Sequence, residues 1–184
     1  ILLFALMLIG VPVAVSLGTS TVLTMIFFTD IDIATIPQLI FDGINKFSLM
    51  AIPMFILAGN LLSKGGSARR IIDFAKSMVG HLPGGLPMSA IFACIIFAAV
   101  SGSSPATVVA IGSIMFAAIK EAGYPKEYAV GGITTAGSLG ILIPPSVVMI
   151  VYGVTAEVSI GKLFMAGVVP GLMLGAFMLV QTYV

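Results

Sequence analysis

Hydroxyl-bearing residues gather in one short stretch of this chain, residues 101–107, which reads Ser-Gly-Ser-Ser-Pro-Ala-Thr. It lies inside an apolar run, 77–119, that contains no Asp, Glu, Lys or Arg. Pro105 has no N–H, so in a helix it could not bond the carbonyl of Ser101, four residues back. In lipid such a carbonyl cannot turn to water, so broken backbone persists only inside protein or against a wet cavity. The stretch is therefore a candidate binding site at membrane depth.

A second stretch of the same kind lies in the uncharged run 128–156, which contains Ser, Thr, Gly and two adjacent prolines. Pro144 and Pro145 deprive the carbonyls of Gly140 and Ile141 of their helical partners. The sequence therefore predicts a discontinuous helix here. Serine hydroxyls and freed carbonyls are oxygen donors of the kind that broken-helix transporters use for Na⁺, and half-helix N-termini attract carboxylates.

Two other interpretations of these stretches compete with an ion site. Small residues can serve only to let helices pack closely. A serine nucleophile at Ser101 or Ser103 would need a base, and the only histidine, His81, lies about 20 residues away. The sequence therefore predicts no enzyme and no catalytic residues. It contains no nucleotide loop, zinc spacing or haem motif, so we expect no cofactor other than a coupling ion.

Composition identifies the class of protein. Of the 184 residues, 59% are hydrophobic and 8% are charged, whereas soluble domains carry about 25% charged residues. The chain is therefore predicted to be an all-α polytopic membrane protein in contact with the lipid bilayer. Its few basic residues are divided among loops, which argues against a nucleic-acid partner. Both ends lie in apolar sequence, so we expect a fragment of a longer protein.

The apolar runs and their breaks divide the chain into four expected parts. Residues 1–85 hold two transmembrane helices, the first kinked near Pro12, and an interfacial amphipathic helix with Ser67 as its N-cap. In that helix Ile71, Ala75, Met78 and Val79 share the apolar face. Residues 86–119 form a re-entrant hairpin, 128–156 a broken transmembrane helix and 163–184 a further transmembrane helix.

Charge favours the hairpin over a single crossing. Its two arms, 86–100 and 105–119, have about 15 residues each, fewer than the roughly 20 that a crossing needs. With a hairpin, six basic residues share one side and two lie opposite; with one crossing the division is five against three. The six are Lys64, Arg69, Arg70, Lys76, Lys120 and Lys126, against Lys46 and Lys162. Because basic loops stay cytoplasmic, the six-to-two division is preferred.

Several motifs, in order along nearly the whole chain, resemble one family. They are IPMFILAGNLL at 52–62, GHLPGG at 80–85, SGSS at 101–104, AIGSI at 110–114, LIPPS at 142–146 and LFMAGVVPG at 163–171. Together they resemble the N-terminal half of the large membrane subunit of tripartite ATP-independent periplasmic (TRAP) transporters, the DctM-like family.

The resemblance implies a fold and an activity. The fold would be one half of an inverted-repeat, elevator-type transporter in the bacterial inner membrane. The activity would be Na⁺-coupled uptake of an organic acid anion, such as a C4-dicarboxylate or sialic acid. A periplasmic solute-binding protein would deliver the substrate, and a small four-helix membrane subunit would be a partner. The alternatives are a passive channel or pore subunit, and a Na⁺/dicarboxylate symporter of related architecture that needs no binding protein.

The resemblance also implies an ion site between the hairpin tip and the broken helix. The expected Na⁺ ligands are tip serines and main-chain carbonyls of the break: Ser101, Ser103, Ser104, Gly140, Ile143 and Pro145. Substrate is expected near Ser101, Ser104 and Ser146. Many relatives carry alanine and an acidic residue directly after the tip serines, where this chain has Pro105, Ala106 and Thr107.

Overall fold

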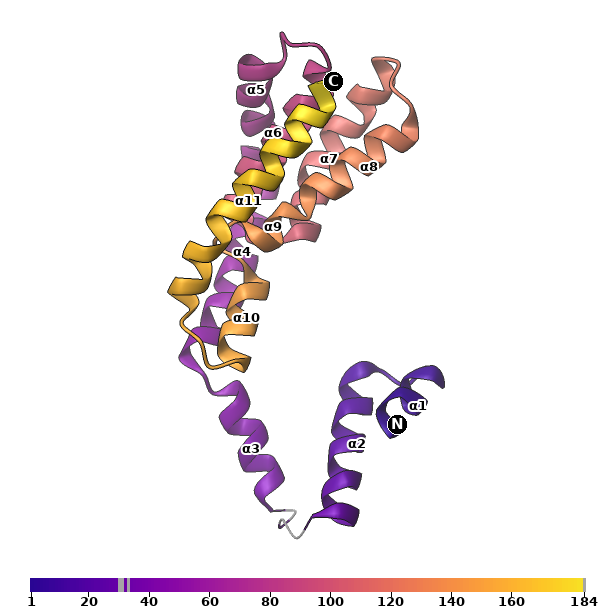
Figure 1. Cartoon of the computed structure of the whole chain (residues 1–184), viewed down its shortest axis with the longest axis vertical. Helices are drawn as coiled ribbons and strands as arrows, with labels where there is room; N and C mark the ends of the chain where they lie inside the picture. Colours follow the sequence, from indigo (N-terminus) through magenta and orange to yellow (C-terminus); the bar gives the residue numbers. More distant parts are fainter. Residues whose placement is uncertain (30–31, 33, 184) are drawn as a thin grey trace. The chain divides into compact units, whose positions relative to one another are not determined.

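The computed structural model describes residues 1–29, 32 and 34–183, and these residues form helices and no strand. They divide into two compact units, Ile1–Lys46 and Phe47–Val184. Figure 1 shows the helices of each unit in order along the chain.

The first unit contains α1 (Leu2–Leu8), α2 (Val13–Phe28) and α3 (Thr35–Ile44). A single kinked helix was expected over 1–29, but the chain instead makes two helices. Gly10 adopts a left-handed φ of 87°, and Pro12 then begins a new helix as the N-cap of α2. Glycine accepts positive φ without strain, and proline cannot continue the preceding helix. The two residues therefore produce a break rather than a kink.

The second unit begins with a 3-10 turn, η1 (Phe47–Met50), followed by α4 (Ala51–Lys64) and α5 (Ser67–Val79). The expected N-cap of α5, Ser67, is wrong: Ser67 is the first helical residue and Gly66 is the cap. Gly66 has a φ of 77°, which turns the chain sharply enough for the helix to begin directly after it.

The helix α5 is amphipathic, but its buried face is centred slightly away from the expected one. Ala68, Ile72 and Ala75 are buried in the core that α5 shares with α6. Met78, expected on the apolar face, remains 48% exposed. The predicted place of α5 at the membrane surface stays a prediction.

The helices α6 (Gly85–Ser101) and α7 (Ser104–Glu121) form a hairpin, with bounds close to the predicted arms. In Figure 1 they lie side by side, joined at a short tip. Eleven of the 17 residues of α6 are buried, among them Phe97 and the only cysteine, Cys94. The core of this unit is therefore built around α6.

The predicted discontinuous helix is present as three pieces: α8 (Lys126–Gly137), α9 (Leu139–Leu142) and α10 (Val147–Thr155). The axis bends by 41° between Lys126–Leu142 and Val147–Thr155. The long helix α11 (Ile160–Tyr183) follows, with Pro170 inside it, and packs against α6, α9 and α10. The break falls at Ile143–Ser146, as the double proline predicts.

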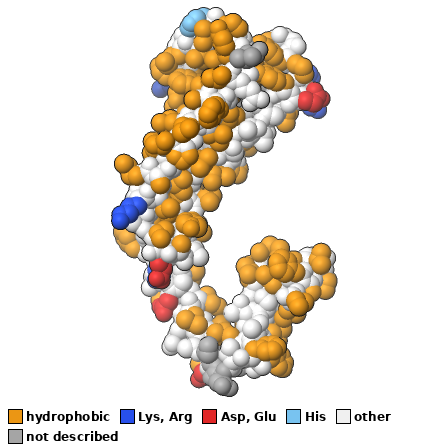
Figure 2. Space-filling model, viewed as in Figure 1, with side chains coloured by type: hydrophobic (Ala, Val, Ile, Leu, Met, Phe, Trp, Pro, Cys, Tyr) orange, Lys and Arg blue, Asp and Glu red, His pale blue; other side chains and the backbone are white. Residues whose placement is uncertain are grey.

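Within the described part of the chain, three helices are long and apolar enough to cross a membrane: Phe47–Lys64, Ser104–Glu121 and Ile160–Tyr183. The bent pair is a fourth if it forms one span. The surface agrees with this assignment. Hydrophobic side chains cover much of the visible face of the second unit (Figure 2), and α11 exposes Met165, Val169, Leu172 and Phe177. Soluble monomers rarely expose apolar surface so extensively. The predicted all-α polytopic membrane fold is confirmed, whereas the re-entrant position of the hairpin stays a prediction.

The packing around α6 predicts that truncating a buried and an exposed phenylalanine will affect stability differently. Phe97 is fully buried in α6, whereas Phe177 of α11 is 65% exposed. Phe97→Ala leaves a cavity in the core and is expected to lower the free energy of unfolding by about 3 kcal/mol. Phe177→Ala leaves none and is expected to change it little. Thermal unfolding of the detergent-solubilised full-length protein measures both, and equal melting temperatures would contradict this core.

Candidate functional site

The hairpin tip is a tight turn with only Gly102 and Ser103 between α6 and α7. Gly102 has a φ of 61°, and its N–H donates to the carbonyl of Ala98 at 3.0 Å, which closes the end of α6. Ser103 is the N-cap of α7, where its hydroxyl accepts from the N–H of Ala106 at 3.5 Å. Pro105 falls in the first turn of α7, where its missing N–H costs no helical bond.

The hydroxyls of Ser101 and Thr107 are completely buried behind this turn. Ser101 Oγ lies 2.9 Å from Thr107 Oγ1. Thr107 Oγ1 in turn donates to the carbonyl oxygen of Ser103 at 2.8 Å. The tip is therefore stabilised by an internal chain of hydrogen bonds as well as by its caps.

The tip lies directly against the break in the discontinuous helix. The N–H of Val147, the first residue of α10, donates to the carbonyl oxygen of Gly102 at 3.2 Å. A Cβ at Gly102 would lie 2.5 Å from the carbonyl oxygen of Pro145. A Cβ at Gly140 would lie 3.0 Å from the backbone nitrogen of Ser104. Two backbones that are far apart in the sequence thus touch at Gly102, where a Cβ would collide, and at Gly140, where it would be tightly crowded.

Two further helices enclose this contact. On α4, a Cβ at Gly59 would lie 3.4 Å from the carbonyl oxygen of Ser101. On α11, a Cβ at Gly167 would lie 2.6 Å from the carbonyl oxygen of Leu142. One turn further along α11, a Cβ at Gly171 would lie 2.8 Å from the side chain of Ile143. Small residues therefore let α4 and α11 approach the tip and the break closely.

The structure brings most of the predicted site residues together. Ser103 and Ser104 lie against Gly140, and Gly102 of the tip lies against Pro145. The side chain of Ile143 instead packs against α11. Ser146 is fully buried, and its hydroxyl accepts from the N–H of Met149 at 3.4 Å, so it caps α10.

Thr107 and Gly59 were not predicted as part of the site. Thr107 lies four residues after Ser103, a spacing at which a threonine hydroxyl reaches back to a carbonyl within a helix. That spacing could have indicated its bond to Ser103. Gly59 packs against Ser101 only because the chain folds back on itself, and no local pattern reports such a contact.

The donors at this site are neutral oxygens. Hydroxyls come from the tip, and the carbonyls of Gly140 and Ile141 have no helical N–H partner four residues later, because Pro144 and Pro145 carry no N–H. Among the described residues no group of three or more His, Cys, Asp or Glu could hold a metal ion. Neutral hydroxyl and carbonyl oxygens suit a hard cation, whereas transition metals prefer imidazole and thiolate.

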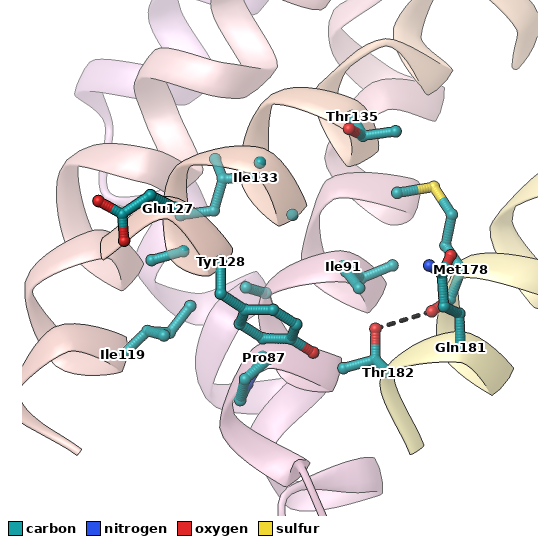
Figure 3. Close-up of a pocket in the computed structure, with 14 residues that line it drawn as sticks. Pro87, Ile91, Ile119, Glu127, Tyr128, Ile133, Thr135, Met178, Gln181 and Thr182 are labelled. Atoms are coloured by element: carbon teal, nitrogen blue, oxygen red, sulfur yellow. Dashed lines mark hydrogen bonds between the residues drawn. The ribbon is translucent and has the colours of Figure 1, made fainter. Parts of the chain in front are cut away.

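A separate cavity of about 290 Å³ lies among α6, α7, α8 and α11. Figure 3 shows the ring of Tyr128 crossing this cavity between α8 and the residues Pro87 and Thr182. Glu127 and Gln181 also line it, and Thr182 donates a hydrogen bond to the carbonyl of Met178 at 2.7 Å. The residues that line it exclude those of the tip and the break, so this cavity is distinct from the predicted site.

Comparison with known proteins identifies the family. The model of the family "Tripartite ATP-independent periplasmic transporter, DctM component" matches residues 1–184. The chain belongs to this family. The TRAP permease resemblance deduced from the motifs is thereby confirmed, and its relatives are named as permeases, which are transporters rather than enzymes.

Three TRAP relatives illustrate the similarity. The chain is 53% identical over 197 residues to the C4-dicarboxylate TRAP transporter large permease protein DctM of Rhodobacter capsulatus, covering 99% of the chain and 44% of that protein. It is 50% identical over 185 residues to the DctM protein of Vibrio cholerae, with 100% and 41% covered. It is 40% identical over 174 residues to the ectoine TRAP transporter large permease protein TeaC of Halomonas elongata, with 94% and 41% covered. The chain spans less than half the length of these relatives.

The contact between tip and break predicts how glycine variants of this TRAP permease behave. Gly123→Ala suffers only the strain of a left-handed φ, about 1–2 kcal/mol, because nothing lies within 4 Å of its Cβ. Gly102→Ala has the same strain and also collides with the carbonyl of Pro145. Loss of the bond to Val147 then adds about 1–3 kcal/mol. Thermal unfolding of the full-length protein should show Gly102→Ala as clearly the less stable variant, and an equal loss would refute the contact.

Proposed function

We propose that this chain contributes a Na⁺ site to the large membrane subunit of a TRAP transporter that takes up an organic acid anion across the bacterial inner membrane. The contact of the hairpin tip with the broken helix, through Gly102 and Val147, is the observation that supports this proposal most directly. It brings a tip that carries three serines against a break at which Pro144 and Pro145 leave carbonyls without helical partners. Hydroxyls and freed carbonyls are the oxygen ligands of ion sites in broken-helix transporters.

The proposed ligands differ in how free their oxygens are. Ser101 and Ser104 offer hydroxyls, and the backbone of Ser104 lies against Gly140, whose carbonyl lacks a helical N–H partner because residue 144 is proline. The hydroxyl of Ser101 bonds Thr107 at 2.9 Å, and the hydroxyl of Ser103 caps α7 through a longer contact of 3.5 Å. The carbonyls of Gly140, Ile143 and Pro145 complete the proposed set from the break. Together these groups surround a cation with oxygen without a buried carboxylate.

The proposed substrate class is a C4-dicarboxylate. The relatives named as C4-dicarboxylate permeases are 50% to 53% identical to the chain, whereas those named for ectoine are 40% and 41% identical. The start of α10, capped by buried Ser146, points the positive end of a helix toward the break. A substrate carboxylate near Ser101, Ser104 and Ser146 would be attracted by this end.

The proposed assembly follows from the family. A periplasmic solute-binding protein delivers the substrate, and a small membrane subunit accompanies the large one. The chain spans less than half the length of its DctM relatives, and we propose that substrate contacts from regions matching the rest of those relatives complete the site.

Transport by the full-length complex in proteoliposomes tests the function. The binding protein is added outside with a labelled C4-dicarboxylate, and an inward Na⁺ gradient is imposed or withheld. Accumulation above the outside concentration that needs both the gradient and the binding protein supports the proposal. Uptake that only equilibrates would indicate a pore, and accumulation without the binding protein would indicate a symporter of related architecture.

The ion site predicts a selective effect of serine variants. Ser101→Ala and Ser104→Ala each remove one hydroxyl ligand to a cation, worth about 1.5–3 kcal/mol, or about 10- to 150-fold in Na⁺ affinity. The Na⁺ concentration for half-maximal uptake should rise by that factor.

Ser89→Ala is a matched control for these variants. Ser89 is also fully buried in α6, but its hydroxyl bonds the carbonyl of Gly85, near the opposite end of that helix from the tip. Uptake by the Ser89→Ala variant should depend on Na⁺ in the same way as uptake by the unmodified protein. If the tip variants and this control titrate alike, the ion site is not at the tip.

A further inference from the structure

A buried hydroxyl beside the proposed ion site has no role among the proposed ligands. Thr107 is completely buried on α7, one turn from the tip, and its Oγ1 lies 2.9 Å from Ser101 Oγ. An apolar side chain of the same shape would pack there without needing any partner. A hydroxyl at such a position must be hydrogen-bonded to avoid a desolvation cost.

The distances determine which way the hydroxyl protons point. A hydroxyl has one proton, and O–H to O hydrogen bonds prefer 2.5–3.0 Å. Thr107 donates its proton to the carbonyl of Ser103 at 2.8 Å, so at the 2.9 Å contact it accepts from Ser101. The other acceptor near the Ser101 hydroxyl, the Ser103 carbonyl, is 3.4 Å away and is a poor competitor. The protons therefore run from Ser101 to Thr107 to the Ser103 carbonyl.

This order matters for a cation. Na⁺ binds the lone pairs of a hydroxyl oxygen, so the proton of that hydroxyl has to point away from the ion. By accepting the proton of Ser101, Thr107 leaves the lone pairs of Ser101 directed elsewhere, where the backbone N–H of Ser103 contacts the oxygen at a long 3.4 Å. Without Thr107, the Ser101 hydroxyl is free to rotate and loses its fixed acceptor.

We infer that Thr107 is a positioning residue that orients the Ser101 hydroxyl for Na⁺ binding without touching the ion. This inference rests on the proposed Na⁺ site at the tip and adds a residue to it. The carbonyl of Ser103 also accepts from the backbone N–H of Thr107 at 3.1 Å, so the start of α7 keeps a bond when the hydroxyl is removed. The side chain can therefore be changed without removing the main-chain bond at the tip.

The test compares Thr107→Val with Thr107→Ser in the full-length transporter. Valine keeps the shape and removes the acceptor, whereas serine keeps the acceptor and removes a methyl group. A lost neutral hydrogen bond corresponds to about a 2- to 12-fold change in affinity. Thr107→Val should raise the Na⁺ concentration for half-maximal uptake by that factor, with the maximal rate at saturating Na⁺ unchanged. Thr107→Ser should titrate like the unmodified protein.

A double variant separates positioning from an independent effect. If Thr107 acts only through Ser101, then Thr107→Val has no further effect on Na⁺ dependence in the Ser101→Ala background. Additive shifts would show that Thr107 affects the ion in another way and would overturn the inference. Na⁺-dependent thermal stabilisation of the purified protein gives the same comparison without transport. The melting temperature measured without Na⁺ reports any purely structural loss of stability.

The outcomes also distinguish this inference from the proposal beneath it. If Ser101→Ala leaves Na⁺ dependence unchanged, the ion site itself is wrong and the inference falls with it. If Ser101→Ala shifts the Na⁺ dependence of uptake but Thr107→Val only lowers stability, the ion site stands and the positioning role is wrong. Equal Na⁺ shifts for Thr107→Val and Thr107→Ser would also overturn it, because serine retains the acceptor.

Discussion

The second unit depends on one contact between two interrupted helices. In a membrane, a helix break leaves backbone groups without partners, and lipid offers none. Here the two breaks supply partners to each other: the N–H that begins α10, on Val147, bonds the carbonyl that ends α6, on Gly102. Leaving such groups buried and unpaired would cost about 1–3 kcal/mol each. The interruption in one element is therefore stable only because the other is present.

Close approach of the backbones imposes the choice of residue at the contact. Gly102 and Gly140 lie where a Cβ would crowd the opposite main chain, and Gly167 on α11 lies where it would collide with the carbonyl of Leu142; at Gly59 on α4 a Cβ would make an ordinary contact with Ser101. Inside their helices, Gly59 and Gly167 each weaken the helix by about 1 kcal/mol relative to alanine. The packing gained across the contact has to offset that cost, which explains why small residues occur at this depth on several helices at once.

Local rules predicted the breaks but not their partners. The missing N–H groups of Pro144 and Pro145 fix the position of the break from sequence alone, and the structure has it at Ile143–Ser146. The hairpin arms were likewise predicted to within a few residues. The cap of α5 was misassigned because the left-handed conformation of Gly66 is decided by the turn that follows α4. Contacts such as Gly59 with Ser101 link residues about forty positions apart, and no periodicity or propensity encodes them.

The neutral character of the tip has a consequence for a transporter. A site built on carboxylates would leave buried negative charge whenever its ion departed, and an unpaired charge inside a membrane is expensive. In the proposed site the hydroxyls of Ser101 and Thr107 and the carbonyl of Ser103 satisfy one another when no ion is bound. The empty site is then already hydrogen-bonded. The free energy of ion binding is therefore only the difference between the ion's coordination and the hydrogen bonds that it replaces. A modest difference of this kind suits a coupling ion, which has to bind on one side of the membrane and leave on the other.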